Sequence, residues 1–366
     1  MDNIQRDKTG KTIEKRLWAI ACFVFAVFFL FVLVLAYLSV RDYYSGELFG
    51  WRNLEILKKS NENQCENCIR RKIDGVLIKE EQAEMYPVAV IIENNIDARP
   101  PVALAEANLV YEAEAEGGIT RYMAVYADGR DIGAIGPIRS ARPYFVDWAR
   151  ELSAVLVHCG GSPEALAMLA QGEILNLNEF YDGDYFWRNE EILAPHNIFT
   201  SSENLYSYLT NKGLTDSMLL SWQYKGDLTL EKRPQTGEII IGYKKPDFVV
   251  KWLYNRESNE YIRYLADEQH KDLSGQQITA KNIVIEYVEA EVIDDELRLK
   301  MNYIGSGEAF VCLDGACVKG SWQKSASAAR TRFYDNQSKE IEFNAGTTWI
   351  EIVQPEREVL VDSQNY

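Results

Sequence analysis

The apolar residues of this chain follow three patterns that divide it along its length. The first is a run of 24 uncharged and mostly apolar residues at positions 17–40. The second, over residues 85–221, alternates short β-prone runs with stretches of helical periodicity. The third, over residues 238–355, consists almost entirely of short β-prone runs. These patterns predict a single transmembrane helix followed by an α/β layered domain and a mostly β C-terminal domain.

The first run has the length of a membrane span, because about 20 apolar residues cross a hydrocarbon core of ~30 Å. A cleaved signal peptide is the alternative, but its apolar region would be only about 7 to 15 residues long. Five basic residues precede the run, and Arg41 next to Asp42 follows it. The positive-inside rule then predicts a cytoplasmic tail at residues 1–16 and an extracytoplasmic location for the bulk of the chain.

The remaining segments are expected to connect these parts. Residues 41–84 should form a stalk or linker, because aromatic residues and leucines at near-helical spacing give way to a polar stretch. Residues 222–237 should connect the two domains, and residues 356–366 should form a C-terminal tail.

Local signals predict several elements of the first domain. Alternation over residues 109–126, interrupted by two glycines, predicts a β-hairpin. Pro143 suits the first position of a helix over residues 144–152. Ser162 is the expected N-cap of a second helix, and Thr200 with Glu203 matches a capping box for a third.

The composition excludes one class of partner. The chain has 39 Lys and Arg against 55 Asp and Glu, a net charge of -16. A nucleic-acid partner is not expected, because duplex affinity depends on basic side chains that neutralise phosphates. An acidic surface also repels anionic lipid headgroups, so contact with the membrane is expected only through the N-terminal helix.

Two cysteines are placed to form a disulfide. Cys312 and Cys317 flank the sequence Leu-Asp-Gly-Ala, and Asp314-Gly315 is a type I′ hairpin signal. The turn would place the two cysteines opposite each other, where Cα atoms approach to about 4.5 Å. Outside the cytoplasm such a pair oxidises readily.

Two arginines precede the first predicted helix. Arg139 and Arg142 lie in the sequence GPIRSARP, where free helix amides already favour an anion. Phosphate or carboxylate is the natural ligand. The alternative is structural: the two guanidinium groups would pair with Glu112, Glu114 and Glu116, which share one face of the predicted hairpin.

Two histidines occupy similar positions ahead of helices. His158 ends a predicted strand before Ser162, and His196 with Asn197 precedes the third helix. Either histidine could act as a general acid or base, although a loop histidine is more often a satisfied hydrogen-bonding group. The sequence contains no P-loop, no Gly-x-Ser-x-Gly and no regular metal-ligand spacing, so neither a cofactor nor a metal is predicted.

A set of long motifs resembles one known family. They are PVAVIIEN at residues 87–94, DARP at 97–100, VYE at 110–112, EGGITR at 116–121, GPIRSARP at 136–143, HCGGSP at 158–163, FWR at 186–188, PHN at 195–197, GSWQK at 320–324, Thr331 and NAGTTWI at 344–350. From about residue 72 to 355 the chain is similar to the YerB-like family of predicted bacterial lipoproteins. The resemblance implies a two-domain extracytoplasmic protein and leaves its activity open. Members commonly attach lipid to a cysteine after a signal peptide, whereas Cys22 lies near the start of the apolar run, so a protein anchor is expected instead.

Three functions fit these observations. The leading hypothesis is a membrane-anchored module of the cell envelope that binds an anionic envelope polymer or another phosphorylated or carboxylated ligand. Its expected ligand-binding residues are Arg121, Arg139, Arg142, His158, Ser162, Arg188, His196 and Asn197. The alternatives are an envelope hydrolase or phosphotransferase that uses His158 or His196 with Arg139 and Arg142, and a scaffold that docks other envelope proteins. The helix entrances that carry these residues are expected to gather along one edge of the sheet.

Overall fold

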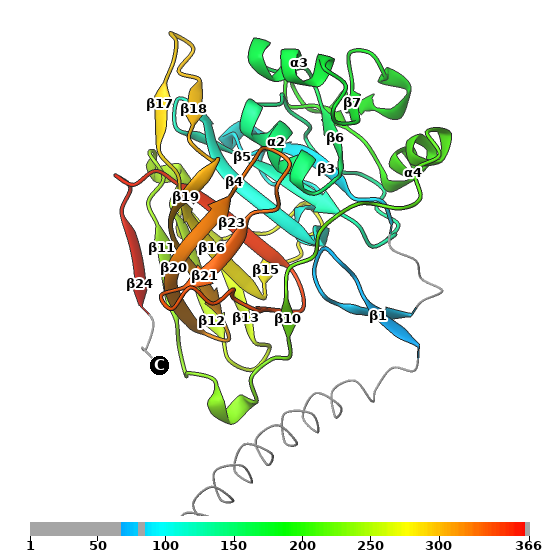
Figure 1. The fold of residues 1–366 in the computed structure, drawn as a ribbon. Helices are drawn as coiled ribbons and strands as arrows, with labels where there is room; N and C mark the ends of the chain where they lie inside the picture. Colours follow the sequence, from blue (N-terminus) through cyan, green and yellow to red (C-terminus); the bar gives the residue numbers. More distant parts are fainter. Residues whose placement is uncertain (1–66, 80–84, 363–366) are drawn as a thin grey trace, which may run out of the picture. The chain divides into compact units, whose positions relative to one another are not determined.

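The computed structural model describes residues 67–79 and 85–362, and strands dominate this part of the chain (Figure 1). Ten strands form the larger sheet, in the order β21 (Arg332–Asp335), β20 (Ala316–Lys324), β19 (Gly305–Leu313), β16 (Asn282–Tyr287), β23 (Thr348–Val353), β4 (Leu109–Glu116), β5 (Ile119–Tyr126), β3 (Val88–Glu93), β6 (Val155–His158) and β7 (Asn176–Asn178). The first half of the chain forms one side of this sheet, and the second half forms the other.

β23 joins the two sides of the larger sheet. It pairs in parallel with β16 on one side and with β4 on the other. All of its residues are buried, as expected of a central strand with both faces covered. A strand near the end of the chain therefore completes a sheet that the first half begins.

A second sheet packs against one face of the larger one. Its strands are β14 (Glu268–Gln269), β13 (Glu260–Leu265), β12 (Val250–Asn255), β11 (Glu238–Ile241) and β24 (Val359–Asp362) in that order, with β15 (Thr279–Ala280) paired to β13. Buried and half-buried residues alternate along β12 and β13, so one face of this sheet turns inward. Trp252 of this sheet contacts Trp349 of β23 edge to face, with ring centroids 5.3 Å apart.

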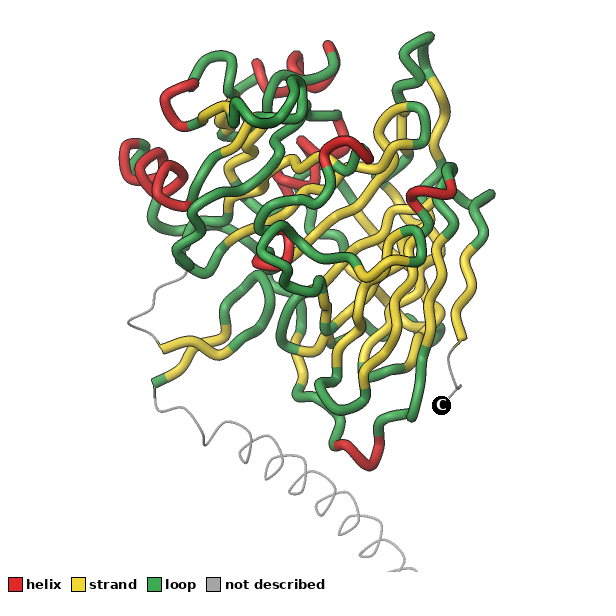
Figure 2. Tube along the Cα trace, turned by 180° about the vertical axis from the view of Figure 1, so that it is seen from behind, coloured by secondary structure: helices red, strands yellow, loops and turns green. Residues whose placement is uncertain are grey.

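The helices gather near the β6 and β7 edge of the larger sheet, while strands continue to the far end of the molecule (Figures 1 and 2). The α-helices of the described residues are α2 (Pro143–Glu151), α3 (Pro163–Ala170) and α4 (Ser202–Asn211). α2 packs on the face of the larger sheet opposite the second sheet. Its Trp148 stacks on Tyr111 of β4, with ring centroids 5.2 Å apart.

Short elements complete the described fold. The two-stranded pairs are β1 (Cys68–Arg70) with β2 (Leu77–Lys79), β8 (Trp187–Arg188) with β9 (Ile198–Phe199), β10 (Tyr224–Lys225) with β22 (Phe343–Asn344), and β17 (Ala290–Val292) with β18 (Leu299–Met301). The 3-10 helices are η1 (Ile96–Ala98), η2 (Leu104–Glu106), η3 (Gly183–Tyr185), η4 (Leu230–Lys232) and η5 (Pro246–Phe248).

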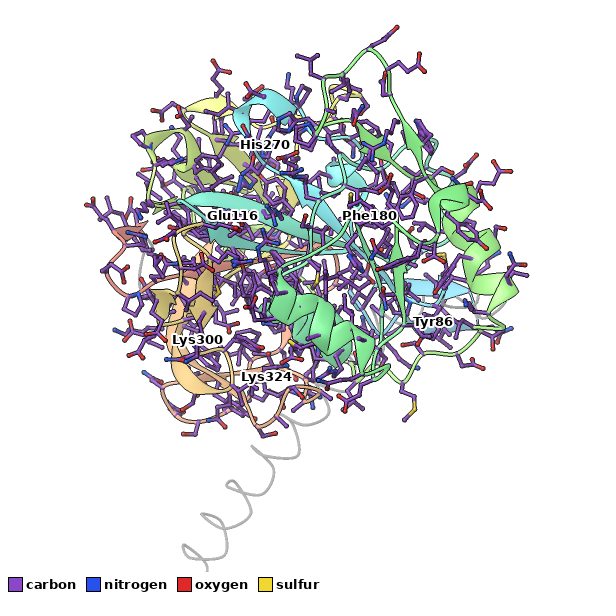
Figure 3. The ribbon with its side chains drawn as sticks, turned by 90° about the horizontal axis from the view of Figure 1, so that it is seen from above. Tyr86, Glu116, Phe180, His270, Lys300 and Lys324 are labelled. Atoms are coloured by element: carbon purple, nitrogen blue, oxygen red, sulfur yellow. A yellow bond between two sulfur atoms is a disulfide. The ribbon has the colours of Figure 1, made fainter. Side chains whose placement is uncertain are left out.

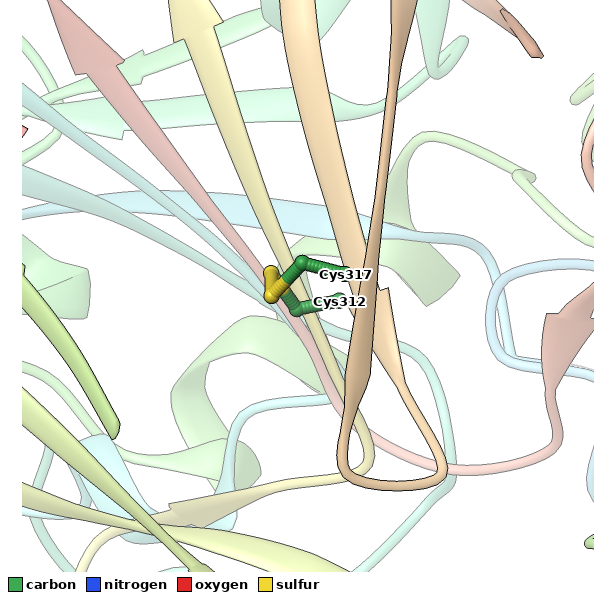
Figure 4. Close-up of a disulfide and its surroundings, with 2 residues drawn as sticks. All are labelled: Cys312 and Cys317. Atoms are coloured by element: carbon green, nitrogen blue, oxygen red, sulfur yellow. A yellow bond between two sulfur atoms is a disulfide. The ribbon is translucent and has the colours of Figure 1, made fainter. Parts of the chain in front are cut away.

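The predicted disulfide between Cys312 and Cys317 is confirmed (Figure 4). The two cysteines are direct partners across β19 and β20, with Cα atoms 3.9 Å apart. Asp314 and Gly315 both have positive φ, at 53° and 82°, as a type I′ turn requires. The turn residues therefore set the register that brings the sulfur atoms together.

Two glutamates lie side by side in the interior between the two sheets. Glu112 of β4 and Glu351 of β23 are register partners, and both are fully buried. The guanidinium group of Arg263 forms an ion pair with Glu112 and lies 3.9 Å from Glu351. Burial raises the pKa of Glu351 to about 8, the charge of Glu112 adds to the shift, and Arg263 opposes it. At neutral pH this pair therefore holds one ionised and one protonated carboxyl group.

A second buried ionic cluster lies on the other face of the larger sheet. Glu151 accepts hydrogen bonds from Lys324, from Arg330 at 2.6 Å and from the Tyr111 hydroxyl at 2.7 Å. Glu286 is also buried on this side, and burial, with a smaller contribution from Glu151, raises its pKa to about 8.

The predicted fold class is wrong. No helix of residues 67–79 and 85–362 is long and apolar enough to cross a membrane. The apolar run at 17–40 lies outside the described residues. The two halves of the chain also share one sheet, because β23 and β16 from the second half continue the sheet of β4 from the first half. Long-range parallel pairing has no local sequence signal, so the strands were correctly expected but not their common sheet.

Replacing Arg263 should destabilise the protein strongly. In Arg263→Met, Glu112 loses its cation, and a stranded buried charge costs about 3 to 5 kcal/mol. Urea unfolding should show this loss in the free energy of unfolding. The double variant Arg263→Met, Glu112→Gln should recover part of it, because the buried charge is then gone. A single variant as stable as the wild type would show that Glu112 does not need the arginine.

Glu286→Gln should remove a pH dependence of stability. The folded state holds the Glu286 proton up to about pH 8, whereas the unfolded chain releases it near the ordinary value of 4.5. Wild-type stability should therefore fall between pH 4.5 and 8 by at most about 1.4 kcal/mol per pH unit. Urea unfolding should show the variant gaining on the wild type across this window. Glu308→Gln, at a carboxylate that is 48% exposed, is the control and should run parallel to the wild type.

Candidate functional site

The predicted site residues lie at one edge of the larger sheet, on strands and on the loops that follow them. β3 and β6 are parallel neighbours, and they end at Glu93 and His158. The chain between β5 and α2 crosses this edge, where Ile138 bridges to Ile92 and Ala141 to Gly161. Figure 3 looks onto this end of the molecule, with Glu116 and Phe180 labelled. The carboxyl ends of parallel strands are where ligands bind in many open sheets.

Glu93 holds two of the predicted residues. One of its carboxylate oxygens lies 3.0 Å from Arg139 Nε, and the other lies 2.8 Å from His196 Nδ1. The glutamate side chain is only 5% exposed, whereas that of Arg139 is 25% exposed. A buried carboxylate therefore forms an ion pair with Arg139, whose Nε makes no hydrogen bond to it, and lies at hydrogen-bonding distance from the His196 imidazole. Both side chains reach the surface.

A second carboxylate fixes a third predicted residue. Glu179, directly after β7, accepts a hydrogen bond from Arg188 Nη2 at 2.8 Å. Arg188 also donates to Asn197 Oδ1 at 3.2 Å, and its side chain is 48% exposed. Cys159 is half-buried beside Glu179. Burial and then the charge of Glu179 raise the pKa of this thiol to about 11, so it stays protonated at neutral pH and is a poor nucleophile.

Aromatic side chains are exposed beside these charges. Phe180 and Tyr181, which follow Glu179, are 68% and 86% exposed. Phe180 crosses over Gly160, whose φ is 64° and where an added Cβ would lie 2.6 Å from the ring. The edge surface, defined here as Arg139, Arg188, His196, Phe180 and Tyr181, therefore combines fixed cationic groups with accessible aromatic rings.

Arg121 and Arg142 are directed inward. Both contact Glu116, Arg121 Nη2 at 3.0 Å and Arg142 through a short ion pair. Burial opposes ionisation of Glu116, but the two guanidinium groups outweigh it and lower its pKa. Both arginines are buried, so the structural alternative considered for Arg142 describes its contacts well, with Glu116 as the partner.

His158 and Ser162 have structural contacts. His158 is completely buried, its Nδ1 lies 2.7 Å from the Gly160 carbonyl, and its Nε2 lies 3.1 Å from Asn176 Oδ1. Burial lowers its pKa, which keeps the ring neutral. Ser162 is the N-cap of α3, as expected, and accepts from the Ala165 amide.

A pocket of about 340 Å³ lies beside this edge, between the starts of α2 and α3 and the β17–β18 hairpin. Arg142 and Ser162 contribute to its lining, with mainly apolar side chains from the hairpin such as Leu299 and Met301. The predicted residues therefore fall into two groups. Arg139, Arg188, His196 and Asn197 meet around Glu93 and Glu179, whereas Arg121, Arg142, His158 and Ser162 make internal contacts.

Sequence reasoning missed Glu93 and Glu179 as the anchors of the edge surface. Each directly follows an apolar or buried strand residue, at the point where a strand reaches the edge. A glutamate at the end of a buried strand was the feature of the sequence that could have indicated these anchors. Its pairing with Arg139 or Arg188 could not be inferred, because the partners come from separate loops.

Comparison with known proteins gives family matches for both halves of the chain. The model described as "Protein of unknown function (DUF3048) N-terminal domain" matches residues 74–215, and that of the DUF3048 C-terminal domain matches residues 239–350. "Putative lipoprotein YerB" from Bacillus subtilis (strain 168) is 28% identical in an alignment of 292 residues that covers 78% of this chain and 86% of the relative. The crystal structure of the YerB protein from Bacillus subtilis aligns with a TM-score of 0.71 at 26% identity, over 80% of this chain and 99% of that one. The resemblance inferred from the motifs is confirmed.

Arg139→Ala should lower stability moderately. The change strands the buried carboxylate of Glu93, although His196 remains as a partner, so the expected loss is about 1 to 3 kcal/mol. Arg332→Ala is a matched control, because Arg332 is 26% exposed and pairs with Glu340, which is 28% exposed. Both partners are half-buried and remain open to water, and Arg332 also donates to the Ser221 carbonyl at 2.9 Å, so the pair should contribute less than about 1 kcal/mol. Equal losses in urea unfolding would mean that the burial of Glu93 does not make Arg139 structurally important.

Proposed function

This chain belongs to the DUF3048 family, whose function is unknown, and we propose that it is a cell-envelope protein that binds an anionic, sugar-containing envelope polymer. The edge surface is the proposed binding site. Attachment to the cell membrane is part of the proposal, and it is supported by the name of the Bacillus subtilis relative, "Putative lipoprotein YerB".

The observation that carries the proposal is the way the two accessible arginines are held. Arg139 contacts Glu93 and Arg188 contacts Glu179. The side chain of each arginine keeps part of its surface in solvent. A guanidinium fixed in this way loses little conformational freedom when it binds phosphate or carboxylate. Charge-assisted hydrogen bonds to such groups are among the stronger polar contacts that proteins make.

The exposed aromatic rings support the sugar component of the ligand. Phe180 and Tyr181 directly follow Glu179, the partner of Arg188, and expose flat apolar faces. Contiguous exposed apolar groups commonly mark binding surfaces. A polymer with alternating sugar rings and anionic groups presents both kinds of partner at short spacing. An isolated inorganic anion would use only the arginines.

Arg188→Ala should weaken polymer binding about tenfold or more, since a charge-assisted contact contributes about 1.5 to 3 kcal/mol. Calorimetric titration of the full chain with a glycerol-phosphate polymer, a carboxylated glycan and a neutral glycan measures the effect. Tyr181→Ala should weaken binding to sugar-bearing polymers only. Arg332→Ala, at the opposite edge of the sheet, should bind like the wild type. Equal affinity of wild type and Arg188→Ala for all three polymers would refute the proposed site.

A hydrolytic function is the second candidate, and the contact between Glu93 and His196 favours it. A buried carboxylate bonded to Nδ1 orients the imidazole, and no described residue is hydrogen-bonded to Nε2. This arrangement suits a general base that activates water. Release of soluble products from the polymers separates the two functions. A hydrolase should release them as the wild type and lose this activity in His196→Gln, whereas a protein that only binds should release none in either form.

A further inference from the structure

We propose that Arg99, Tyr122, Arg263 and His270 form an interior binding site for a small monovalent anion. These four side chains, the interior cluster, meet between the larger sheet and the second sheet. Figure 3 labels His270, which comes from the loop after β14. The interior cluster is separate from the edge surface, and neither proposal depends on the other.

A continuous set of contacts brings the four side chains together. Arg263 Nη1 lies 3.3 Å from His270 Nδ1, and the rings of His270 and Tyr122 have centroids 6.2 Å apart. The guanidinium carbon of Arg263 lies 5.9 Å from the Tyr122 ring centroid. Arg99 joins through Asn94, whose Oδ1 accepts from Arg99 Nε at 3.0 Å and whose Nδ2 donates at 3.3 Å to Glu112, the ion-pair partner of Arg263.

Each member of the interior cluster has a buried polar atom without a hydrogen-bond partner among the described residues. These atoms are Arg99 Nη2, the Tyr122 hydroxyl, Arg263 Nε and His270 Nε2. Tyr122 and Arg263 are fully buried, and His270 is 6% exposed. Buried polar groups are normally hydrogen-bonded, because an unsatisfied one has lost its hydrogen bonds to water without replacement. Four such atoms in one cluster indicate a common guest.

The chemistry of the atoms and the charge around them define that guest. The two arginine atoms can only donate hydrogen bonds, so the guest must be an acceptor. Arg99 has no carboxylate within ion-pair distance in the described chain, and Glu112 already neutralises Arg263. Glu351 is protonated at neutral pH, and burial together with the two arginines lowers the pKa of His270, which keeps it uncharged. The interior cluster together with Glu112 therefore has an excess positive charge of one, which a monovalent anion balances.

The proposed site also explains why the chain contains Arg99. This residue lies in the DARP sequence after η1 and is not part of the edge surface. Its Nη1 donates to the Asp247 carbonyl at 2.9 Å, and its guanidinium lies over the Phe248 ring. An anion shared by Arg99 and Arg263 would tie the segment after β3 to the second sheet.

Chloride and bromide are suitable probes. Thermal unfolding of the full chain at constant ionic strength, with chloride replacing gluconate, should show a melting temperature that rises and saturates. Arg99→Gln and Tyr122→Phe should each lose most of this saturable rise, whereas Arg332→Gln should retain it. Tyr122→Phe keeps the ring and provides the test if Arg99→Gln does not fold.

A bromide-soaked crystal of the wild-type protein locates the site directly. An anomalous peak within hydrogen-bonding distance of Arg99 Nη2 and Arg263 Nε is the expected result. Ordered water at that position without a bromide peak would overturn the proposal, and so would an equal chloride response in the wild type, Arg99→Gln and Tyr122→Phe.

Discussion

The contact between Arg263 and the paired carboxyl groups of Glu112 and Glu351 is the constraint on which the rest of the fold depends. The two glutamates are register partners on neighbouring strands from opposite ends of the chain. Two negative charges so close together in the interior would repel each other strongly, so one must be neutralised by a cation and the other by a proton. Arg263 comes from the second sheet and lies 4.5 Å from the Trp349 ring centroid. The ionic contact therefore links the central strands of the larger sheet to the second sheet.

The same strand leads from this interior contact to the edge of the sheet. Glu112, Glu114 and Glu116 follow each other along β4, and each has a different cationic partner. Glu114 forms an ion pair with Arg357. A bulge between Glu114 and Glu116 changes the direction of the Glu116 side chain, which pairs with Arg121 and Arg142. Arg139 and Arg188 lie beyond β3 and β7, and their side chains stay 25% and 48% exposed beside Glu93 and Glu179.

Local sequence rules predicted the parts of the structure that local interactions determine. The hairpin of β4 and β5, the N-cap Ser162 and the register of Cys312 and Cys317 all depend on turn and capping residues within a few positions. The capping box at Thr200 was wrong, because Ser201 is the N-cap and accepts from the Asn204 amide. Two capable residues in succession leave the choice to the tertiary contacts, and Thr200 instead donates to the Tyr185 carbonyl. The sequence suggested Arg139, Arg188 and His196 as ligand-binding residues, and this stays a prediction. Their carboxylate partners, Glu93 at the end of β3 and Glu179 after β7, are brought to them by the tertiary fold.

The charge of the whole chain sets a condition on any polyanion that reaches the edge surface. Arg139 and Arg188 are each balanced by one glutamate, so the surface has little net positive charge of its own, and the chain as a whole has a net charge of -16. The long-range field therefore opposes the approach of a polyanion, although the final contacts are favourable. Salt screens the long-range repulsion over about 10 Å at 0.1 M and also weakens exposed ion pairs. Moderate salt should then speed association while it shortens the life of the complex, which is the opposite of the steered association that a basic surface would produce.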